Sequence, residues 1–296
     1  MSFRCGFIGF LGRPNTGKST LLNALVGEKI AITTDRPQTT RNIIRGVHTT
    51  SDTQYIFVDV PGIYKPRHKL GAMMYKSIYS GLADADLIYY LVDGSRRFGR
   101  EEEAIIASLD HFKKPVFLIL NKIDLLTKKQ LLDLLESYAA RYQFSELIPI
   151  SALKQDNLQT LLEVTRRYLP ESSPYYPSEQ KAELSESFRI RELIREKAVA
   201  LTMEEVPHAV AVVLDQLSKN RDTYLLDATI VVERDSQKAI LIGKNGSMIR
   251  EIGSAARKDI EALLGGPVFL QLFVRVEKDW RNKPGRLSEL GYTELG

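Results

Sequence analysis

The chain has 296 residues, of which 44% are hydrophobic and 26% are charged, and its formal net charge at pH 7 is +4. This length allows two domains with separate cores, and the composition is that of an ordinary soluble protein. No apolar run is long enough to cross a bilayer, the first residues lack the layout of a signal peptide, and the single cysteine, Cys5, cannot form an internal disulfide. We therefore expect a protein of the reducing cytoplasm.

The chain begins with an apolar run, Cys5 to Phe10, that predicts a buried strand, and apolar residues at helical spacing follow from Leu21. Between them lies GRPNTGKS, residues 12–19, where glycines mark a tight turn and lysine and serine start the helix. Such a loop directs its amide groups and the positive end of the helix at one point, an arrangement that binds a polyphosphate. We expect nucleotide contacts from Gly12, Arg13, Pro14, Asn15, Thr16, Gly17, Lys18, Ser19 and Thr20.

Strands and helices then alternate to about residue 170. Strands are predicted at 45–50, 55–59, 87–92, 116–120 and 147–150, and amphipathic helices at 72–82, 100–111, 128–142 and 156–168. This alternation predicts an α/β fold with a mostly parallel sheet wrapped by helices. Three strands end in polar motifs at the edge where such sheets bind ligands, namely DVPG at 59–62, NKID at 121–124 and SAL at 151–153.

Together with GRPNTGKS and the threonines at 39 and 40, these motifs follow the order of the translation-factor-related GTPases, which this part of the chain resembles. An ionised Asp124 can accept two hydrogen bonds from guanine, whereas adenine offers no such pair of donors, so GTP is preferred to ATP. The resemblance implies that Asn121 supports this loop, that Lys122 lies along the base and that the Ala152 amide reaches the guanine oxygen. The implied base contacts are Asn121, Lys122, Asp124, Ser151, Ala152 and Leu153.

The same resemblance implies the phosphate side of the site. Lys18 is expected at the β and γ phosphates, with Ser19 and Thr40 in the shell of a Mg²⁺ ion that Asp59 holds through water. Loss of the γ-phosphate would release Thr40 and the Gly62 amide, which makes Lys18, Thr40 and Gly62 the expected catalytic residues.

Two residues bear on the rate of turnover. Ile63 follows DVPG, and a hydrocarbon cannot orient water as a glutamine does, so we expect slow intrinsic hydrolysis. In similar GTPases with an apolar residue there, an asparagine at the place of Asn15 helps to bind a monovalent cation. Asn15 is therefore either a potassium ligand or a polar turn residue that bonds its own loop.

Prolines and serines at 169–180 predict an extended linker, which we place at 171–182 between domains at 1–170 and 183–296. The second domain opens with a helix, and strands are predicted at 210–217, 224–233 and 268–276. The segment 237–266 predicts a strand, a GKNG loop at 243–246 and two helices.

This order resembles an α+β KH domain of the bacterial topology, type II, in which a GxxG loop clamps the backbone of an unpaired RNA strand. Its glycines allow close approach to phosphate and Lys244 adds charge. Trp280, among basic residues, is expected either to stack on a base or to anchor the tail by packing. RNA contacts are expected from Ile242, Gly243, Lys244, Asn245, Gly246, Ser247, Met248, Arg250, Lys278, Trp280 and Arg281.

PQTTR at 37–41, GIYKPRHKLG at 62–71 and the ending WRNKPGRLSELGY extend the resemblance to the Era family over the whole chain. It implies a GTPase that uses GTP, GDP and Mg²⁺, binds the 3′ end of 16S rRNA and assists small-subunit assembly, as a monomer with a fraction on the inner face of the cell membrane. We expect GTP to order residues 33–41 and 60–75 and so to change how the KH domain docks.

Three questions stay open at this point. Potassium is a cofactor only if Asn15 binds it. The nucleotide could be structural and never hydrolysed. The KH domain could contact protein or another RNA, in a protein that is still regulated by GTP.

Overall fold

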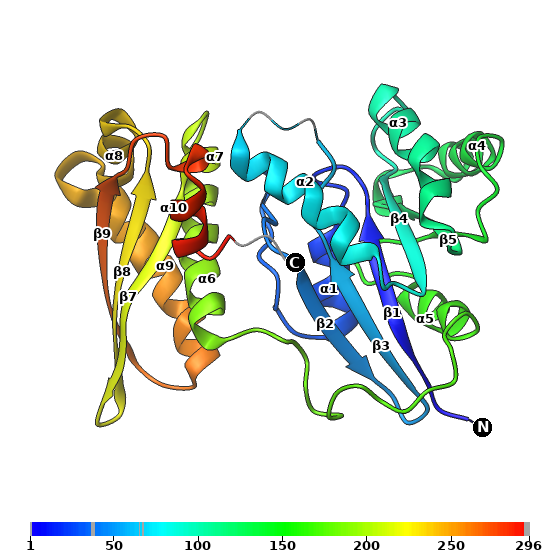
Figure 1. Cartoon of the computed structure of the whole chain (residues 1–296), viewed down its shortest axis with the longest axis horizontal. Helices are drawn as coiled ribbons and strands as arrows, with labels where there is room; N and C mark the ends of the chain where they lie inside the picture. The colour runs from blue at the N-terminus through cyan, green and yellow to red at the C-terminus, as the bar shows by residue number, and fades with distance from the viewer. Residues whose placement is uncertain (1, 37–38, 65, 67, 293–296) are drawn as a thin grey trace.

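The computed structural model describes residues 2–36, 39–64, 66 and 68–292, and these form two sheets that are each covered by helices (Figure 1). Pro37 and Gln38 of the predicted segment 33–41, and Lys65 and Arg67 of the segment 60–75, lie outside the described residues. No helix within the described ranges is long and apolar enough to cross a membrane.

The first sheet has six strands in the order β2-β3-β1-β4-β5-β6, in which β2 is antiparallel to β3 and the other pairs are parallel. The strands are β1 (Arg4–Leu11), β2 (Ile44–Thr49), β3 (Thr53–Asp59), β4 (Leu87–Asp93), β5 (Val116–Asn121) and β6 (Glu146–Pro149). Strands β3, β4 and β5 are buried along their whole length, because helices cover both faces. The predicted α/β class with a mostly parallel sheet is confirmed.

Five helices cover this sheet. Those that pack on one face are α1 (Lys18–Val26) and α5 (Leu158–Arg166); those on the other are α2 (Lys69–Leu82), α3 (Arg100–Ser108) and α4 (Lys128–Ala139). Helix α2 begins earlier than predicted, because the His68 ring accepts a hydrogen bond from the Gly71 amide and caps it. Since β1, β3, β5 and β6 are parallel, the loops that follow them meet at one edge.

The segment 171–182, where we place the linker, is held against the first sheet. The Gln54 side chain accepts hydrogen bonds from the amides of Tyr175 and Tyr176. Further along, the Val47 amide of β2 donates to the Lys181 carbonyl over 2.8 Å. The chain leaves this edge only just before the next helix, whose N-cap is Ser185.

The second sheet has three strands in the order β7-β8-β9, with β7 antiparallel and β9 parallel to β8. Its elements are α6 (Glu186–Leu201), α7 (Val206–Ala209), β7 (Ala211–Asn220), β8 (Thr223–Val232), α8 (Asp235–Ile242), α9 (Ser247–Leu264) and β9 (Val268–Val276). Apolar side chains of α6, α8 and α9 pack on one face. A C-terminal segment, the 3-10 turn Trp280–Asn282 and α10 (Pro284–Glu289), packs against the opposite face at Ala211 and Val231.

Two predictions for this domain are wrong. The run expected to be a strand after Gln237 is helix α8, whose first turn is held by hydrogen bonds from the amides of Glu233 and Arg234 to the Gln237 side chain. The two helices expected after GKNG are the single helix α9. Gly253 does not break it, because the helix is held by packing and the Leu272 side chain lies 3.4 Å from where a Cβ of Gly253 would be.

Candidate nucleotide site and RNA interface

The loop after β1 has the backbone that its glycines allow. Gly12 and Gly17 have φ of 154° and 95°, and a Cβ on Gly12 would lie 2.5 Å from the Leu91 carbonyl oxygen. The Lys18 ammonium is buried and donates to the carbonyls of Gly12 and Arg13 over 3.3 and 3.0 Å. Burial lowers the pKa of Lys18, partly offset by Asp59. A buried cation without a hydrogen-bonded carboxylate inside an amide-lined loop is suited to bind phosphate.

Ser19, Thr40 and Asp59 come from three different segments and meet beside this loop. The Ser19 hydroxyl donates to Asp59 Oδ2 over 2.6 Å and lies 2.8 Å from the Thr40 hydroxyl. Asp59 Oδ1 is buried and has no hydrogen-bond partner among the described residues. Desolvation raises the pKa of Asp59 to about 6, although Lys18 and Ser19 lower it. Two hydroxyls and an orphaned carboxylate oxygen are a donor set that fits Mg²⁺.

The base side is formed by the ends of β5 and β6. Ser151 Oγ donates to Asp124 Oδ1 over 2.6 Å, which orients the carboxylate. The Asn121 side chain donates to the Thr16 carbonyl over 2.8 Å and so ties this loop to the phosphate loop. Lys122 pairs with Asp93 at the end of β4, over 2.7 Å.

The structure differs from expectation at Ala152. Its amide, expected at the guanine oxygen, donates to Asn121 Oδ1 over 2.9 Å, because the turn after β6 closes onto that side chain. The exposed Leu153 lies at the mouth of the same site, next to Asp124.

These residues surround a cavity of about 410 Å³. The predicted residues that line it are Pro14, Asn15, Gly17, Lys18, Ser19, Thr20, Thr40, Gly62, Asn121, Lys122, Asp124, Ser151, Ala152 and Leu153. The described lining does not include the other predicted residues, which are Gly12, Arg13, Thr16 and Asp59. The Arg13 side chain points away from the cavity and pairs with Glu101 and Glu102.

Sequence reasoning missed part of this lining. The lining residues that it did not assign are Ile32, Thr33, Thr34, Asp35, Thr39, Arg96 and Leu125. Most of them belong to segment 29–42, which is polar and rich in threonine, and whose lack of periodicity gives no sign of where it folds. Its placement follows from contacts with the second domain, which no local pattern reveals.

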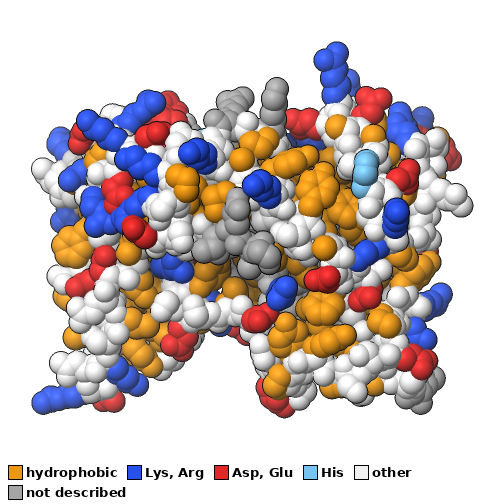
Figure 2. All heavy atoms as spheres, in the orientation of Figure 1, with side chains coloured by type: hydrophobic (Ala, Val, Ile, Leu, Met, Phe, Trp, Pro, Cys, Tyr) orange, Lys and Arg blue, Asp and Glu red, His pale blue; other side chains and the backbone are white. Residues whose placement is uncertain are grey.

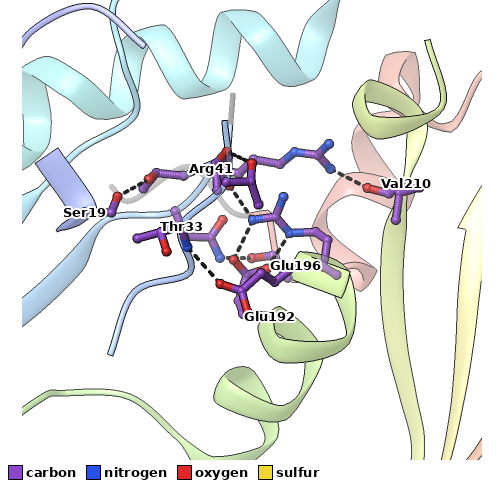
Figure 3. Close-up of polar contacts among 12 residues, drawn as sticks. Ser19, Thr33, Arg41, Glu192, Glu196 and Val210 are labelled. Carbon is purple, nitrogen blue, oxygen red and sulfur yellow. Dashed lines mark hydrogen bonds and ion pairs between the residues drawn. The ribbon is translucent and has the colours of Figure 1, made fainter. Parts of the chain in front are cut away.

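Residues 33–36 and 39–41 lie between the two domains (Figure 3). Thr40 faces Ser19, and the next residue, Arg41, points the other way (Figure 3). The Arg41 guanidinium is buried and donates to the Val210 carbonyl over 2.6 Å. It also reaches the carbonyls of Pro207 and His208 at 3.2 and 3.3 Å. Burial lowers the pKa of Arg41, partly offset by the Tyr292 hydroxyl.

Helix α6 makes the matching contacts from the other side (Figure 3). Glu196 accepts a hydrogen bond from the Thr33 amide over 3.0 Å and pairs with Lys29 over 2.6 Å. Arg195 is buried, pairs with Glu192 and donates to the Thr39 carbonyl. A single segment therefore contacts the magnesium-type donor set and the second domain at once.

Helix α2 forms a second contact between the domains. Its apolar residues Leu70 and Met74 pack in one cluster with Trp280, Leu287 and Tyr292 of the C-terminal segment. Because α2 directly follows the loop that contains Gly62, both loops expected to sense the γ-phosphate are joined to the second domain.

The GKNG loop connects α8 to α9. Gly243 and Gly246 have φ of 71° and 74°, and a Cβ on Gly243 would lie 2.8 Å from the Met248 amide nitrogen. Nothing lies within 4 Å of a Cβ position on Gly246, so this side of the loop is open. Lys244 and Asn245 are exposed, and Arg250 donates to the carbonyls of Asn245 and Gly246. Lys and Arg side chains gather over this part of the domain, at the upper left of Figure 2.

A groove of about 340 Å³ lies beside this loop, between α9 and β9. It is lined by Ile249, Arg250, Gly253, Ser254, Arg257, Phe269, Leu270 and Leu272. Of these, only Arg250 had been assigned to RNA. A signal for Phe269 exists in the sequence, since β9 carries phenylalanines at two of the positions where its alternation predicts polar residues.

The expected role of Trp280 in stacking on RNA is wrong for this structure. The side chain is fully buried, and its Nε1 donates to the Ala209 carbonyl over 2.9 Å. Trp280 therefore anchors the tail, which was the packing alternative. Arg281 pairs with Glu233 over 2.5 Å, whereas Lys278 is exposed.

Known proteins match both halves of the chain. Residues 7–122 match the family described as 50S ribosome-binding GTPase, and residues 205–281 match the KH domain. A tyrosine-to-alanine variant of Aquifex aeolicus Era bound to GDP·AlF₄⁻ is 36% identical, with 98% of this chain and 100% of that one covered and a TM-score of 0.95. This chain belongs to the Era family. As an Era-family protein it is a GTPase with a KH domain.

A second Era structure bears on the arrangement of the domains. Era in complex with MgGDPNP and nucleotides 1506–1542 of 16S ribosomal RNA is 36% identical, with 98% of this chain and 99% of that one covered and a TM-score of 0.96. A score this high over both domains requires a similar placement of the two domains. The Era-family chain described above therefore has the domain arrangement of a relative that holds a GTP analogue and RNA.

Proposed function

We propose that this protein is a GTP-driven switch that binds the 3′ end of 16S rRNA through its KH domain and assists assembly of the small ribosomal subunit. One observation carries the proposal. Adjacent residues of segment 33–41 serve both sites: Thr40 lies at the Ser19 hydroxyl, and Arg41 is bonded to the KH domain at Val210. The rRNA target is taken from the related Era complex.

The nucleotide residues proposed are those that the sequence assigned. Lys18 binds the β and γ phosphates, Asp124 reads guanine, and Ser19, Thr40 and Asp59 hold Mg²⁺. A Mg²⁺ ion held by these three residues would offset negative charge that develops on the phosphates during hydrolysis. The Asn15 amide donates to the Asp35 carbonyl over 2.7 Å, which leaves its oxygen available for K⁺.

The switch works through loss of contacts. When the γ-phosphate leaves, Thr40 and the Gly62 amide lose a partner, and the segments that hold them become free to move. Gly62 packs closely on the phosphate loop, since a Cβ there would lie 2.7 Å from the Pro14 nitrogen. Movement of Thr40 carries Arg41 away from Val210, so the KH domain loses this contact with the GTPase domain.

The cellular setting is also a proposal. We infer a cytoplasmic monomer, divided into domains at 1–170 and 183–296 with a linker at 171–182. Association of a fraction with the inner face of the cell membrane, and a place in ribosome biogenesis, rest on the family resemblance.

The test compares RNA affinity in three nucleotide states. The full chain is loaded with GDPNP, with GDP or left empty, and an oligonucleotide of the 16S 3′ end is titrated by fluorescence anisotropy. We expect the tightest binding with GDPNP. Gly246→Asp is the control, because it sets a negative charge against phosphate in the clamp. Equal affinity in all three states contradicts the switch.

A second measurement addresses hydrolysis. Phosphate release from GTP is followed with and without the same oligonucleotide, and we expect slow release that RNA changes. No release under either condition means that the nucleotide is structural. RNA binding that Gly246→Asp leaves unchanged means that the KH domain contacts another partner.

A further inference from the structure

Strand β9 carries two large apolar side chains that the described structure leaves about half exposed. Phe269 and Phe273 are 55% and 52% exposed, whereas the aromatic side chains of β1, β3 and β4 are largely or fully buried. They alternate with Leu270 and Leu272, which pack toward the helices, so both rings stand on the opposite face of the sheet. β9 is also the edge strand that lies farthest from the GTPase domain (Figure 1).

The rest of this outer face shows how much of it is open. Phe273 pairs with Thr229 and Arg275 pairs with Val231 across the parallel ladder. The C-terminal segment covers Val231 and also packs against Val213, and Thr229 itself is buried. Phe273 therefore lies at the border of the covered region, and the face stays partly exposed from there to Phe269, where Leu225 and Asp227 are half-buried.

One of the exposed rings, Phe269, is connected to the proposed RNA clamp by a groove. Phe269 also lines the groove between α9 and β9, together with Arg250 and Arg257. Arg250 in turn bonds the carbonyls of the GKNG loop. A strand of RNA that leaves the clamp along this groove meets Phe269 at the far end, because β9 begins beside the end of α9, where the Val268 amide donates to Glu261. Phe273 lies about 13 Å from Phe269 along β9, back toward the level of the clamp, at the usual rise per residue.

We propose that Phe269 and Phe273 form a second RNA subsite, on which unpaired bases beyond the four held by the GKNG clamp stack. This inference rests on the proposed function of the KH domain. Exposed aromatic rings on an open sheet are a general platform for bases, and stacking tolerates any sequence because every base has a π-face. The KH domain thus reads a longer strand than its loop alone can hold.

Charge determines which side of the RNA faces the sheet. Asp227, opposite Gln271, and Asp215, which bonds the Thr229 hydroxyl, place carboxylates on the same outer face. These repel phosphates but can accept hydrogen bonds from base amino groups. Arg250 and Arg257 lie on the other side of β9, at the groove. Bases therefore face the sheet, while the phosphates follow the groove.

The first test measures affinity for a fluorescein-labelled oligonucleotide of the last twelve nucleotides of 16S rRNA, with the full chain and GDPNP. Phe269→Ala and Phe273→Ala should each weaken binding about fivefold to a hundredfold, the range for loss of one stacked base. The slope of log affinity against log salt should stay that of the wild type, because no phosphate contact is removed. Arg257→Ala, the matched control, should weaken binding and also reduce that slope.

The second test detects stacking directly. Phe273→Trp keeps an aromatic ring and should retain affinity, and its indole fluorescence should be quenched when the oligonucleotide is added. The native Trp280 is buried and gives a constant background. Leu132→Trp, on an exposed site of α4 in the GTPase domain, is the control that should not respond.

The outcomes separate the subsite from the proposed function. If both alanine variants bind RNA as tightly as the wild type, or if RNA does not quench Phe273→Trp, the subsite is overturned. The proposed function survives either result if Gly246→Asp still abolishes RNA binding. No RNA binding by the wild type rejects the proposed function itself. Alanine variants that change the sedimentation coefficient but not RNA affinity assign this face to protein contacts and also overturn the subsite.

Discussion

Arg41 is the residue whose removal most directly tests the link between the two sites. Arg41→Ala leaves Thr40 in place and removes a buried guanidinium from the carbonyls of Pro207, His208 and Val210. A hydrogen bond to a charged group contributes about 1.5–3 kcal/mol. Only the Val210 bond is short, at 2.6 Å, and the cost of burying the guanidinium offsets part of the gain. We therefore take about 2 kcal/mol as the contribution of Arg41 to the free energy of docking between the two domains, which corresponds to a factor of about thirty in the docking equilibrium constant.

That magnitude is large enough to remove the coupling. Coupling free energies between sites are typically about 1–3 kcal/mol. The variant should bind GDPNP and RNA separately with nearly normal affinity, but GDPNP should no longer tighten RNA binding by more than about twofold. By reciprocity, RNA should no longer tighten binding of GDPNP, provided that the two effects are measured in one buffer.

The assay is a pair of titrations with a fluorescent GDPNP derivative and with the 16S 3′-end oligonucleotide, each with and without the other ligand. Arg97→Ala is the control, since Arg97 is exposed on the GTPase domain and its loss changes net charge equally. Full coupling in Arg41→Ala, or equal loss in both variants, would refute the argument that this contact transmits the nucleotide state.

Three further predictions concern the nucleotide site. In EDTA, Asp59→Asn should raise the melting temperature at pH 7.5 and raise it less at pH 5. The native pKa of Asp59, about 6, lies above the ordinary aspartate value of 3.8, so the metal-free wild type loses about 1.4 kcal/mol of stability as the pH rises from 5 to 7.5. Scanning fluorimetry that finds no pH-dependent difference contradicts this prediction. Asp124→Asn should lower GTP affinity at least about a thousandfold and favour XTP, whose carbonyl at C2 accepts a bond from the new amide; competition titrations in which GTP still wins would reject the assignment. Replacing Na⁺ by K⁺ should raise phosphate release by the wild type and not by Asn15→Ala, and equal rates in both salts for the wild type exclude a potassium role for Asn15.

The sequence predicts the GTPase domain well because each polar motif directly follows a run of apolar residues that forms a buried strand. Each of the segments 59–62, 121–124 and 151–153 follows a strand that is mainly apolar, so the location of the site depends only on strand order. The predictions that failed had weaker physical signals. The run before Gly243 is short and apolar, which fits a strand or a buried helix equally, and the Gln237 bonds that favour the helix depend on the turn before it.

Contacts between distant parts of the chain could not be read from local pattern. Trp280 sits among basic residues, a composition typical of RNA contact, yet the Ala209 carbonyl and the outer face of the sheet bury it. Arg41 follows Thr40 in a motif that indicates phosphate sensing, and nothing in the sequence shows that its own partner is Val210. Such pairs follow only from tertiary docking.

The linker sets the range of the motion that the switch can use. Its backbone is bonded to the first sheet up to the Glu183 amide, which donates to Arg45, and α6 is capped at Ser185. While these bonds hold, only about two peptide units between Glu183 and Ser185 are free to act as a hinge. The KH domain can therefore rotate about this short hinge but cannot diffuse freely around the GTPase domain. Its clamp then stays within a short arc of the GTPase domain even when undocked, and reclosing is a local event that does not depend on protein concentration.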